Sequence, residues 1–370
     1  MPAFCFPGGR RDTARMQTHL APQPLDTATA LPAQFYVDAA MQATDRSLVF
    51  DRAWQLVAHV SQLRATGDHV IADLAGLPVI AVRGGDGQIR VMHNVCRHRA
   101  GPIAQCDGLA AKSLRCRYHG WTYTLEGQLR SAPEMQGTRD FDVADIQLPQ
   151  LAVKVWQGLV FAAVDAASAP DFDAFVTGID ARLGDDRGLA DYAGHHRASY
   201  DIACNWKVYV DNYLEGYHVP HVHPGLNRLL DYRSYRTELT PWHSLQWSPL
   251  ESDASLYGNG DALYYWLWPN TMLNILPGRL QTNTVIPLGV DRCRVSFDSY
   301  YADAGDAGKR AADLAFSDEV QHEDLGICED VQRGFASGSY VPGRLNPLRE
   351  SGVHHFHELL RSAYRSEVQA

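Results

Sequence analysis

Short runs that mix hydrophobic and polar residues dominate the chain from about residue 68 to 165. Four of them cover residues 79–82, 89–92, 121–124 and 159–162, and each is rich in Val, Ile, Thr, Tyr or Phe. Glycine, proline and aspartate separate these runs, as is typical of strands that are joined by tight turns. The pattern predicts a small all-β domain in this part of the chain.

The pattern changes after Asp165. Helical periodicity is found at residues 170–184, 204–218 and 309–336, and long alternating segments such as 292–301 lie between them. In that last segment Val295 and Phe297 alternate with Arg294 and Asp298. Helices packed on an antiparallel sheet make a second domain of α+β type, and α+β is the predicted class of the whole chain.

The region before the β-runs predicts two further features. Residues 1–32 are rich in proline, glycine, alanine and threonine, so we expect a flexible leader there. A helix is expected over residues 45–64. Its buried stripe would consist of Trp54, Leu56, Val57, Val60 and Leu63. The predicted domains are therefore a leader (1–32), a β-rich domain with a preceding helix (33–165) and an α+β domain (166–370).

Composition excludes several classes of protein. The chain has 370 residues, 45% of them hydrophobic, and a formal net charge of -10 without a basic cluster, so nucleic acid is an unexpected partner. The acidic surface slightly favours a cationic substrate, although solubility explains it more simply. No apolar run approaches the ~20 residues of a membrane span, and no export signal is evident, so we expect a cytoplasmic location. Seven cysteines, an odd number, favour ligands and free thiols over disulfides.

The strongest local motif is Cys96-Arg97-His98 followed, seventeen residues later, by Cys116-Arg117-Tyr118-His119. Two thiolates can hold one iron of a [2Fe–2S] cluster while two imidazoles hold the other. The alternative is structural zinc, which also takes two cysteines and two histidines. Zinc fingers usually pair Cys with Cys and His with His, whereas both pairs here are mixed. The order of the ligands and the β-rich surroundings favour the cluster.

A second group of candidate ligands follows Asn205-Trp206-Lys207. Asp211, Glu215 and His218 have i, i+4, i+7 spacing and would share one helical face. Pro220 would end or kink that helix, so that His223 could fold back towards His218. Two histidines and one carboxylate leave open positions on Fe(II) for O2 and substrate. The carboxylate must come from elsewhere, and the predicted helix over 321–333 offers Asp324 and Glu329.

Both motifs resemble those of Rieske-type ring-hydroxylating oxygenases. Respiratory Rieske proteins carry an additional cysteine in each loop, and neither loop here has one nearby. Cys106, ten residues after Cys96, is expected to be a buried thiol. The segment N-W-K followed by D-x3-E-x2-H-x4-H is similar to the catalytic-domain signature of the oxygenase α subunits. The resemblance implies that His218, His223 and Asp324 bind iron, with Glu329 as the alternative to Asp324.

The same resemblance implies the architecture and the cofactors. We expect a β-sandwich Rieske domain, a helix-grip catalytic domain, a [2Fe–2S] cluster, a mononuclear Fe(II) and O2 as co-substrate. Because the chain has no G-x-G-x-x-G of its own, electrons from NAD(P)H would arrive through a separate flavin-containing or iron–sulfur reductase. The family is usually trimeric. In the trimer an acid links the cluster of one subunit to the mononuclear iron of the next.

That linking acid is usually Asp in the family, and Glu215 stands in its place here. Together with Asp211 and Asn212, this segment is similar to choline, betaine and carnitine monooxygenases. The resemblance therefore gives Asp211, Asn212 and Glu215 as catalytic candidates. The substrate would be an aromatic compound or a quaternary amine, and the sequence does not separate hydroxylation from oxidative demethylation.

Two other functions remain open on the residues alone. A Rieske electron-transfer protein without catalysis would need only the first motif, and helix-grip domains can serve as ligand-binding modules. An oxygenase needs three irons per chain, whereas an electron carrier needs two.

Several further motifs are expected to have structural roles. His195-His196 should begin a strand, His221 should not bind metal, and His354-His355-x-His357 should lie at a solvated helix start. Alternation places Tyr264, Trp266 and Trp268 on one face of a strand. They would form either part of the core or an aromatic wall that holds a cation.

Overall fold

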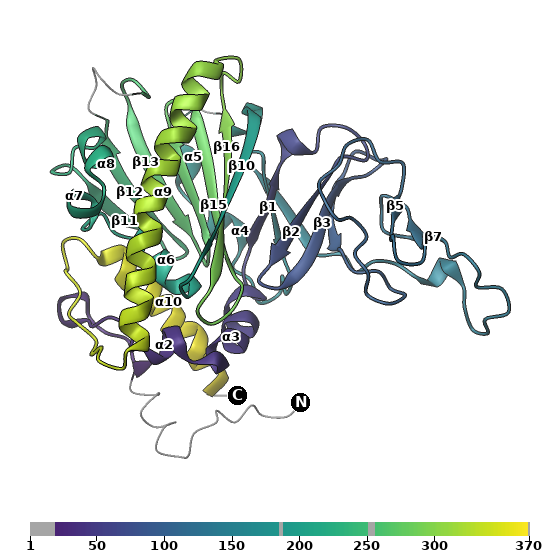
Figure 1. Ribbon diagram of the computed structural model, residues 1–370, viewed down its shortest axis with the longest axis horizontal. Coiled ribbons are helices and arrows are strands. Elements are labelled where there is room, and N and C mark those ends of the chain that lie inside the picture. Colours follow the sequence, from purple (N-terminus) through teal and green to yellow (C-terminus); the bar gives the residue numbers. More distant parts are fainter. Residues whose placement is uncertain (1–18, 185–187, 251–255, 369–370) are drawn as a thin grey trace.

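A computed structural model describes residues 19–184, 188–250 and 256–368 (Figure 1). The first eighteen residues of the predicted leader lie outside the described residues. Within these ranges, none of the helices combines the length and the apolar character of a membrane span. Figure 1 shows a large sheet with the longest helix across one face and a smaller β-rich part that projects to one side.

The smaller part is the predicted all-β domain, and it contains three antiparallel sheets of three strands each within the described residues. Strand order is β1-β9-β8 in the first sheet, β2-β3-β4 in the second and β5-β6-β7 in the third. The third sheet lies at the end of the domain that is farthest from the helices (Figure 1). The strands are β1 (Gln55–His59), β2 (His69–Leu74), β3 (Leu77–Arg83), β4 (Ile89–His93), β5 (Leu114–Arg115), β6 (Thr122–Tyr123), β7 (Leu129–Ser131), β8 (Ala152–Trp156) and β9 (Leu159–Ala163).

The larger part is built on one antiparallel sheet with the order β10-β16-β15-β14-β13-β12-β11. The long helix α9 (Ala307–Ala336) crosses one face of this sheet (Figure 1). This arrangement confirms the predicted α+β catalytic domain. The strands are β10 (Ala193–Ile202), β11 (Arg236–Leu239), β12 (His243–Pro249), β13 (Asp261–Leu267), β14 (Thr271–Leu276), β15 (Arg279–Pro287) and β16 (Cys293–Tyr301). The shorter helices are α4 (Phe172–Phe175), α5 (Ile179–Leu183), α6 (Trp206–Tyr213), α7 (Val219–Val222), α8 (Pro224–Leu229) and α10 (Ser351–Val368).

The predicted helix over residues 45–64 is wrong in its second half. Helix α3 (Ala39–Asp45) continues into a π-helical turn, η2 (Arg46–Phe50), and the chain then enters strand β1. All five residues of β1 are buried, including Gln55 and His59, so its apolar run Leu56-Val57-Ala58 lacks the alternation of a half-exposed strand. Such a run cannot be distinguished from a helix by periodicity alone. Its partner, β9, lies about a hundred residues later in the chain.

The segment before β1 packs against the catalytic domain. Asp45 accepts hydrogen bonds from Trp206 Nε1 (2.8 Å) and from the Tyr364 hydroxyl, and it forms a buried ion pair with Lys207. These partners belong to α6 and α10. Leu20, Ala28 and Leu31 are buried as well. Residues 19–32 are therefore not a flexible leader, because their apolar side chains are part of the catalytic core.

Helix α6 ends earlier than expected. It stops at Tyr213 instead of 218, and Pro220 lies in the first turn of α7 rather than ending α6. Gly216 lies in the connecting turn, where a Cβ atom would come within 2.7 Å of the Tyr235 ring. The chain therefore turns at a position where the Tyr235 ring leaves no room for a side chain.

Two further expectations about burial are wrong. Cys106 is exposed, because it lies in the irregular segment between β4 and β5. His357 lies in α10 but is only 1% exposed, since it packs against Tyr36 and Asp211. Other expectations are confirmed: His195 and His196 lie near the start of β10, and Trp266 and Trp268 are core residues.

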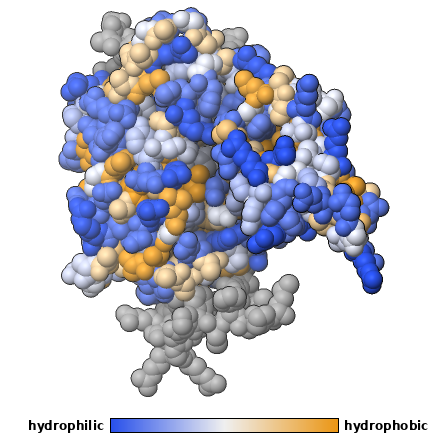
Figure 2. Space-filling view, turned by 45° about the vertical axis from the view of Figure 1, so that its right-hand side comes forward, coloured by the Kyte–Doolittle hydropathy of each residue, from blue (hydrophilic) through white to orange (hydrophobic). Residues whose placement is uncertain are grey.

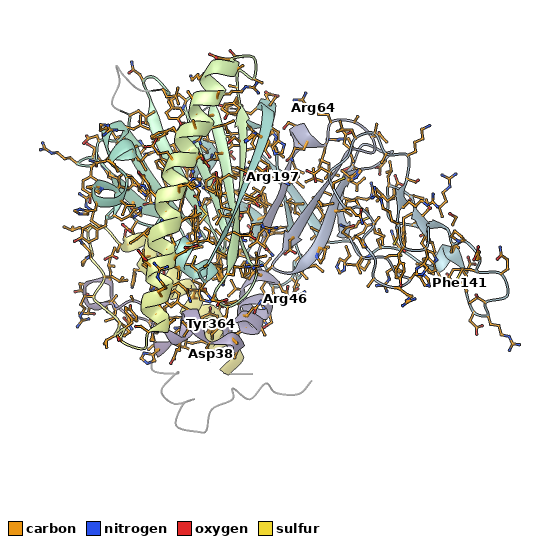
Figure 3. The ribbon with its side chains drawn as sticks, viewed as in Figure 1. Asp38, Arg46, Arg64, Phe141, Arg197 and Tyr364 are labelled. Atoms are coloured by element: carbon orange, nitrogen blue, oxygen red, sulfur yellow. The ribbon has the colours of Figure 1, made fainter. Side chains whose placement is uncertain are left out.

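The two domains meet through buried and charged contacts. Arg197 lies at the junction (Figure 3), where it pairs with Asp298 at 2.8 Å in its own domain and with Asp107 at 3.7 Å in the β-rich domain. His59 of β1 is fully buried, and its Nε2 lies 3.1 Å from the carbonyl oxygen of Leu189. In Figure 2 the end of the β-rich domain stands away from the main body, with mostly hydrophilic residues on the face in view.

Candidate metal centres and substrate pocket

Two loops of the same shape present the residues of the first motif. In each loop the cysteine carbonyl accepts a hydrogen bond from the backbone N–H four residues later. These bonds are Ala100 to Cys96 and Gly120 to Cys116, both 3.0 Å long. Gly120 has φ +74°, a conformation that favours glycine. The repeated turn places each Cys and its neighbouring His on the same side of the loop.

The four side chains converge at the far end of the β-rich domain. Cys96 and Cys116 are buried, and the rings of His98 and His119 lie 4.5 Å apart between centroids. Gly101 lets the loops approach, because a Cβ there would be only 3.1 Å from Cys116 Sγ. The Nδ1 atom of His98 is buried and has no hydrogen-bond partner among the described residues. Two thiols and two imidazoles with a free ring nitrogen fit a [2Fe–2S] cluster of the Rieske kind.

Two aromatic residues that the sequence analysis did not single out support this site. Trp121 stacks on His98 with 4.8 Å between the ring centroids. The Tyr123 hydroxyl lies 3.3 Å from Cys96 Sγ, and burial raises the pKa of this phenol, which therefore stays protonated. Hydrogen bonds to a cluster sulfur help to set its reduction potential. The signal in the sequence was the aromatic run Trp121-Thr122-Tyr123, which begins two residues after the second histidine.

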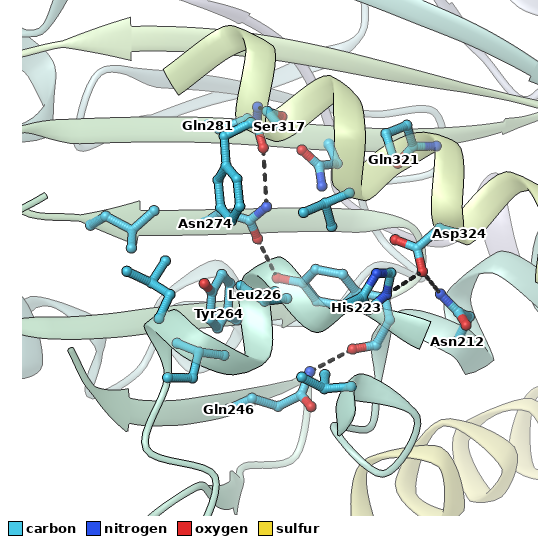
Figure 4. Close-up of a pocket in the computed structure, with 18 of the residues that line it drawn as sticks. Asn212, His223, Leu226, Gln246, Tyr264, Asn274, Gln281, Ser317, Gln321 and Asp324 are labelled. Atoms are coloured by element: carbon cyan, nitrogen blue, oxygen red, sulfur yellow. Dashed lines mark hydrogen bonds and ion pairs between the residues drawn. The ribbon is translucent and has the colours of Figure 1, made fainter. Parts of the chain in front are cut away.

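The second candidate centre brings together His218, His223 and Asp324. Their ligand atoms all lie within 4.8 Å of one another. His223 Nε2 is 3.0 Å from Oδ1 of Asp324 (Figure 4). His218 Nε2 is 3.8 Å from the same oxygen. Two imidazoles and one carboxylate on one side of a point are a suitable donor set for Fe(II) with open positions.

Hydrogen bonds orient each member of this triad. Glu215 Oε1 lies 2.6 Å from Nδ1 of His218, so the other ring nitrogen of His218 faces Asp324. Asn212 donates from Nδ2 to Asp324 Oδ1 over 2.6 Å. Such partners fix the tautomer and the direction of metal ligands. Asn212 and Glu215 therefore contact the triad directly, as their place in the motif suggested.

His223 has an orienting partner that the sequence analysis missed. Its Nδ1 lies 2.7 Å from Glu323 Oε2. Burial alone would lower the pKa of His223, but the hydrogen bonds and charges of Asp324 and Glu323 outweigh burial and raise it. The adjacent acids Glu323-Asp324 were visible in the sequence, but only the fold shows that both reach the same imidazole.

The remaining candidates lie elsewhere. Asp211 accepts a hydrogen bond from the Tyr36 hydroxyl (2.6 Å) and lies 2.9 Å from His357 Nε2, away from the triad. Glu329, the alternative third ligand, accepts a hydrogen bond from the backbone of Ala203. His221 is exposed.

A pocket opens directly beside the triad, between α9 and the large sheet (Figure 4). Tyrosine is its most frequent aromatic residue, and Arg279 is the only Lys or Arg among its described lining residues. Polar side chains on one wall bond to one another: Asn274 donates to Gln281 (3.2 Å), and Gln281 donates to Ser317 (2.8 Å). The tyrosines that line it are Tyr209, Tyr213, Tyr235, Tyr257 and Tyr264.

Comparison with known proteins supports both centres. A family model described as the Rieske [2Fe-2S] domain matches residues 53–149, and the ring hydroxylating alpha subunit catalytic domain matches residues 189–366. Choline monooxygenase from the chloroplast of Arabidopsis thaliana is 35% identical over 367 residues, which is 94% of this chain and 86% of the relative. The carnitine monooxygenase oxygenase subunit of Escherichia coli (strain K12) is 29% identical over 360 residues, 91% of this chain and 94% of that protein.

Solved structures agree with this result. A quaternary ammonium Rieske monooxygenase superposes with a TM-score of 0.85 and 26% identity, over 93% of this chain and 99% of the other. Naphthalene 1,2-dioxygenase superposes with a TM-score of 0.73 and 16% identity, over 93% of this chain and 95% of the other, so it shares the fold. These findings confirm the family that the motifs resembled. The chain is a member of the Rieske-type ring-hydroxylating oxygenase α subunits, and its cofactors are a Rieske [2Fe–2S] cluster and a mononuclear iron.

Proposed function

We propose that this oxygenase subunit hydroxylates or oxidatively demethylates a quaternary ammonium compound. The observation that carries the proposal is the pocket beside the triad, which is lined by the rings of five tyrosines. A quaternary ammonium group has no N–H to donate, so proteins hold it through aromatic faces. Relatives that are named choline and carnitine monooxygenases support the same substrate class.

We propose His218, His223 and Asp324 as the ligands of the mononuclear iron, and Cys96, His98, Cys116 and His119 as those of the cluster. When bound, the cluster supplies electrons and the mononuclear iron supplies activation of O2.

The chain's own residues would prepare the site for that chemistry. Glu215 and Glu323 keep the Nε2 atoms of the two histidines directed at one point, and Asn212 holds Asp324. The pocket walls place the substrate and exclude water.

Electrons would enter from a neighbouring copy of the chain. The cluster loops lie at the far end of the β-rich domain, well away from α6 and α9 (Figure 1). Tyr118, in the second cluster loop, is exposed by 56%, and Tyr217 beside Glu215 is exposed by 47%. Such apolar surface at both ends suits a head-to-tail contact. We propose a homotrimer in which Glu215 links the neighbour's cluster to His218. A separate flavin-containing or iron–sulfur reductase would supply electrons from NAD(P)H.

Iron stoichiometry and substrate-dependent O2 uptake test the proposal. Three irons per chain are expected, whereas an electron carrier would bind two and a ligand-binding module none. With a reductase, O2 uptake should rise with choline, carnitine or other quaternary amines and stay at background with naphthalene or benzoate. Stimulation by the aromatic compounds alone would overturn the assignment of the substrate class.

A further inference from the structure

Arg279 is a buried cation on the wall of the substrate pocket. It begins β15, is only 5% exposed and lines the same pocket as the iron triad. Its Nε donates to Asp313 Oδ2 over 3.0 Å. Neither of its terminal nitrogens, Nη1 and Nη2, makes a hydrogen bond within the described residues. Because buried donors are normally satisfied, open N–H groups on a pocket wall indicate a place for a ligand.

Asp313 holds the guanidinium of Arg279 in place through the hydrogen bond to Nε. This aspartate is 1% exposed and lies on α9. It also accepts hydrogen bonds from the hydroxyls of Tyr257 and Tyr301. Three donors thus share one carboxylate, which reduces the negative charge available to Arg279. The guanidinium is held in place through Nε and keeps a positive face for a partner.

Arg279 and the iron triad belong to opposite ends of the pocket. Asp313 and Asp324 are both on α9 and eleven residues apart, which corresponds to about 16 Å along a helix. Between these ends the pocket is lined by tyrosine rings, including Tyr264 (Figure 4). An elongated molecule could therefore contact the tyrosines with one part and Arg279 with its far end.

We propose that Arg279 binds the carboxylate of a zwitterionic quaternary ammonium substrate, whose methylated nitrogen points towards His218 and His223. This inference rests on the proposed function and narrows it to carboxylate-bearing compounds. The two terminal nitrogens of a guanidinium form a planar fork that matches the two oxygens of a carboxylate. A hydroxyl group, as in choline, can use only part of this fork and brings no opposite charge.

A pair of matched ligands tests this binding mode. γ-Butyrobetaine and butyltrimethylammonium share the cation and nearly the same length, but only the first has a carboxylate. Isothermal titration calorimetry of the wild-type holoprotein should show tighter binding of γ-butyrobetaine by about 10- to 100-fold. In Arg279→Gln this preference should disappear, while butyltrimethylammonium keeps its affinity. Arg279→Lys keeps the charge but not the planar fork, so it should retain part of the preference for γ-butyrobetaine.

Arg294→Gln is the matched control, because Arg294 forms a partly exposed ion pair with Asp201 and does not line this pocket. If the wild-type protein binds γ-butyrobetaine and butyltrimethylammonium equally tightly, the inference is wrong, and this result needs no variant. If Arg279→Gln lowers the affinity for both ligands equally, Arg279 does not bind the carboxylate and only supports the structure of the pocket. In both cases oxidation of quaternary amines would leave the proposed function standing. If neither ligand binds and no quaternary amine raises O2 uptake, the proposed function fails and the inference fails with it.

Discussion

Glu323 lies 2.7 Å from Nδ1 of His223, while the next residue in the chain lies 3.0 Å from Nε2 of the same ring. The imidazole is thus held at one nitrogen by Glu323 and directed at Asp324 with the other. Two adjacent acids on one helix therefore have different tasks.

Replacement of Glu323 should loosen the mononuclear site. Glu323→Gln removes the charge that orients His223, so the affinity for iron should fall by about 10- to 100-fold. Iron retained after a timed challenge with a chelator measures the effect, and the Rieske spectrum should not change. Glu329→Gln, on the same helix but bonded to the Ala203 backbone, should retain iron like the wild type. If Glu323→Gln resists the chelator as well as the wild type, Glu323 has no role in orienting His223.

Glu215→Gln should separate metal binding from electron transfer. The substitution keeps size and shape, so the cluster should still accept electrons. Because Glu215 also orients His218, the mononuclear site should bind iron more weakly, as in Glu323→Gln, and should fill when iron is supplied in excess. The link between subunits loses its charge, and oxidation of the pre-reduced cluster in the presence of O2 and substrate should slow steeply. Glu215→Asp shortens the link and should slow it less. Single-turnover spectroscopy makes the measurement. Reoxidation at the wild-type rate with full iron would exclude Glu215 as the link.

The two centres should empty independently, because they lie in different domains. His98→Ala and His119→Ala should abolish the Rieske EPR signal of the reduced protein and keep mononuclear iron. His218→Ala, His223→Ala and Asp324→Ala should do the reverse. Cys106→Ser is a suitable control, since this thiol is exposed and outside the cluster loops. A Rieske signal that persists in both histidine variants of the first group would show that the cluster ligands are assigned incorrectly.

Stability should fall as the pH drops from about 6.5 towards 4. Burial lowers the pKa of His59 from 6.5 to about 4, so the folded state binds this proton less readily than the unfolded state. The contribution is complete above pH 6.5, is lost progressively as pH falls to about 4, and amounts to about 3 kcal/mol at most. His59→Gln should flatten this part of the pH profile of urea unfolding. His196→Gln, at an exposed position of β10, should not. An unchanged profile in His59→Gln would contradict the assignment.

Local sequence patterns predicted most of the chemistry. Cys96, His98, Cys116 and His119 lie in short loops whose spacing alone defines the site, and the E-x2-H-x4-H segment places Glu215 beside His218. The choice of Asp324 over Glu329 rested on the resemblance, because Asp324 reaches the triad from another helix more than a hundred residues later.

The parts that local patterns could not predict depend on contacts between distant segments. Strand β1 looked helical because both of its faces are buried, with Leu56 in one hydrophobic cluster and Val57 and Ala58 in another. Arg279 follows Pro277-Gly278 and looks like an exposed turn residue until Asp313, 34 residues later, covers it. Asp211 has the spacing of a catalytic residue, but α6 turns it towards Tyr36.

The contacts of Asp45 have a consequence for the order of folding. The β-rich domain is continuous in sequence, since β1 to β9 span residues 55 to 163. It can therefore form while the chain is still being synthesised. The catalytic domain needs both ends of the chain, because Asp45 must meet Lys207 of α6 and Tyr364 of α10. Contacts across more than three hundred residues form slowly. The domain that holds the mononuclear iron should thus be the last to close, after the ribosome has released α10.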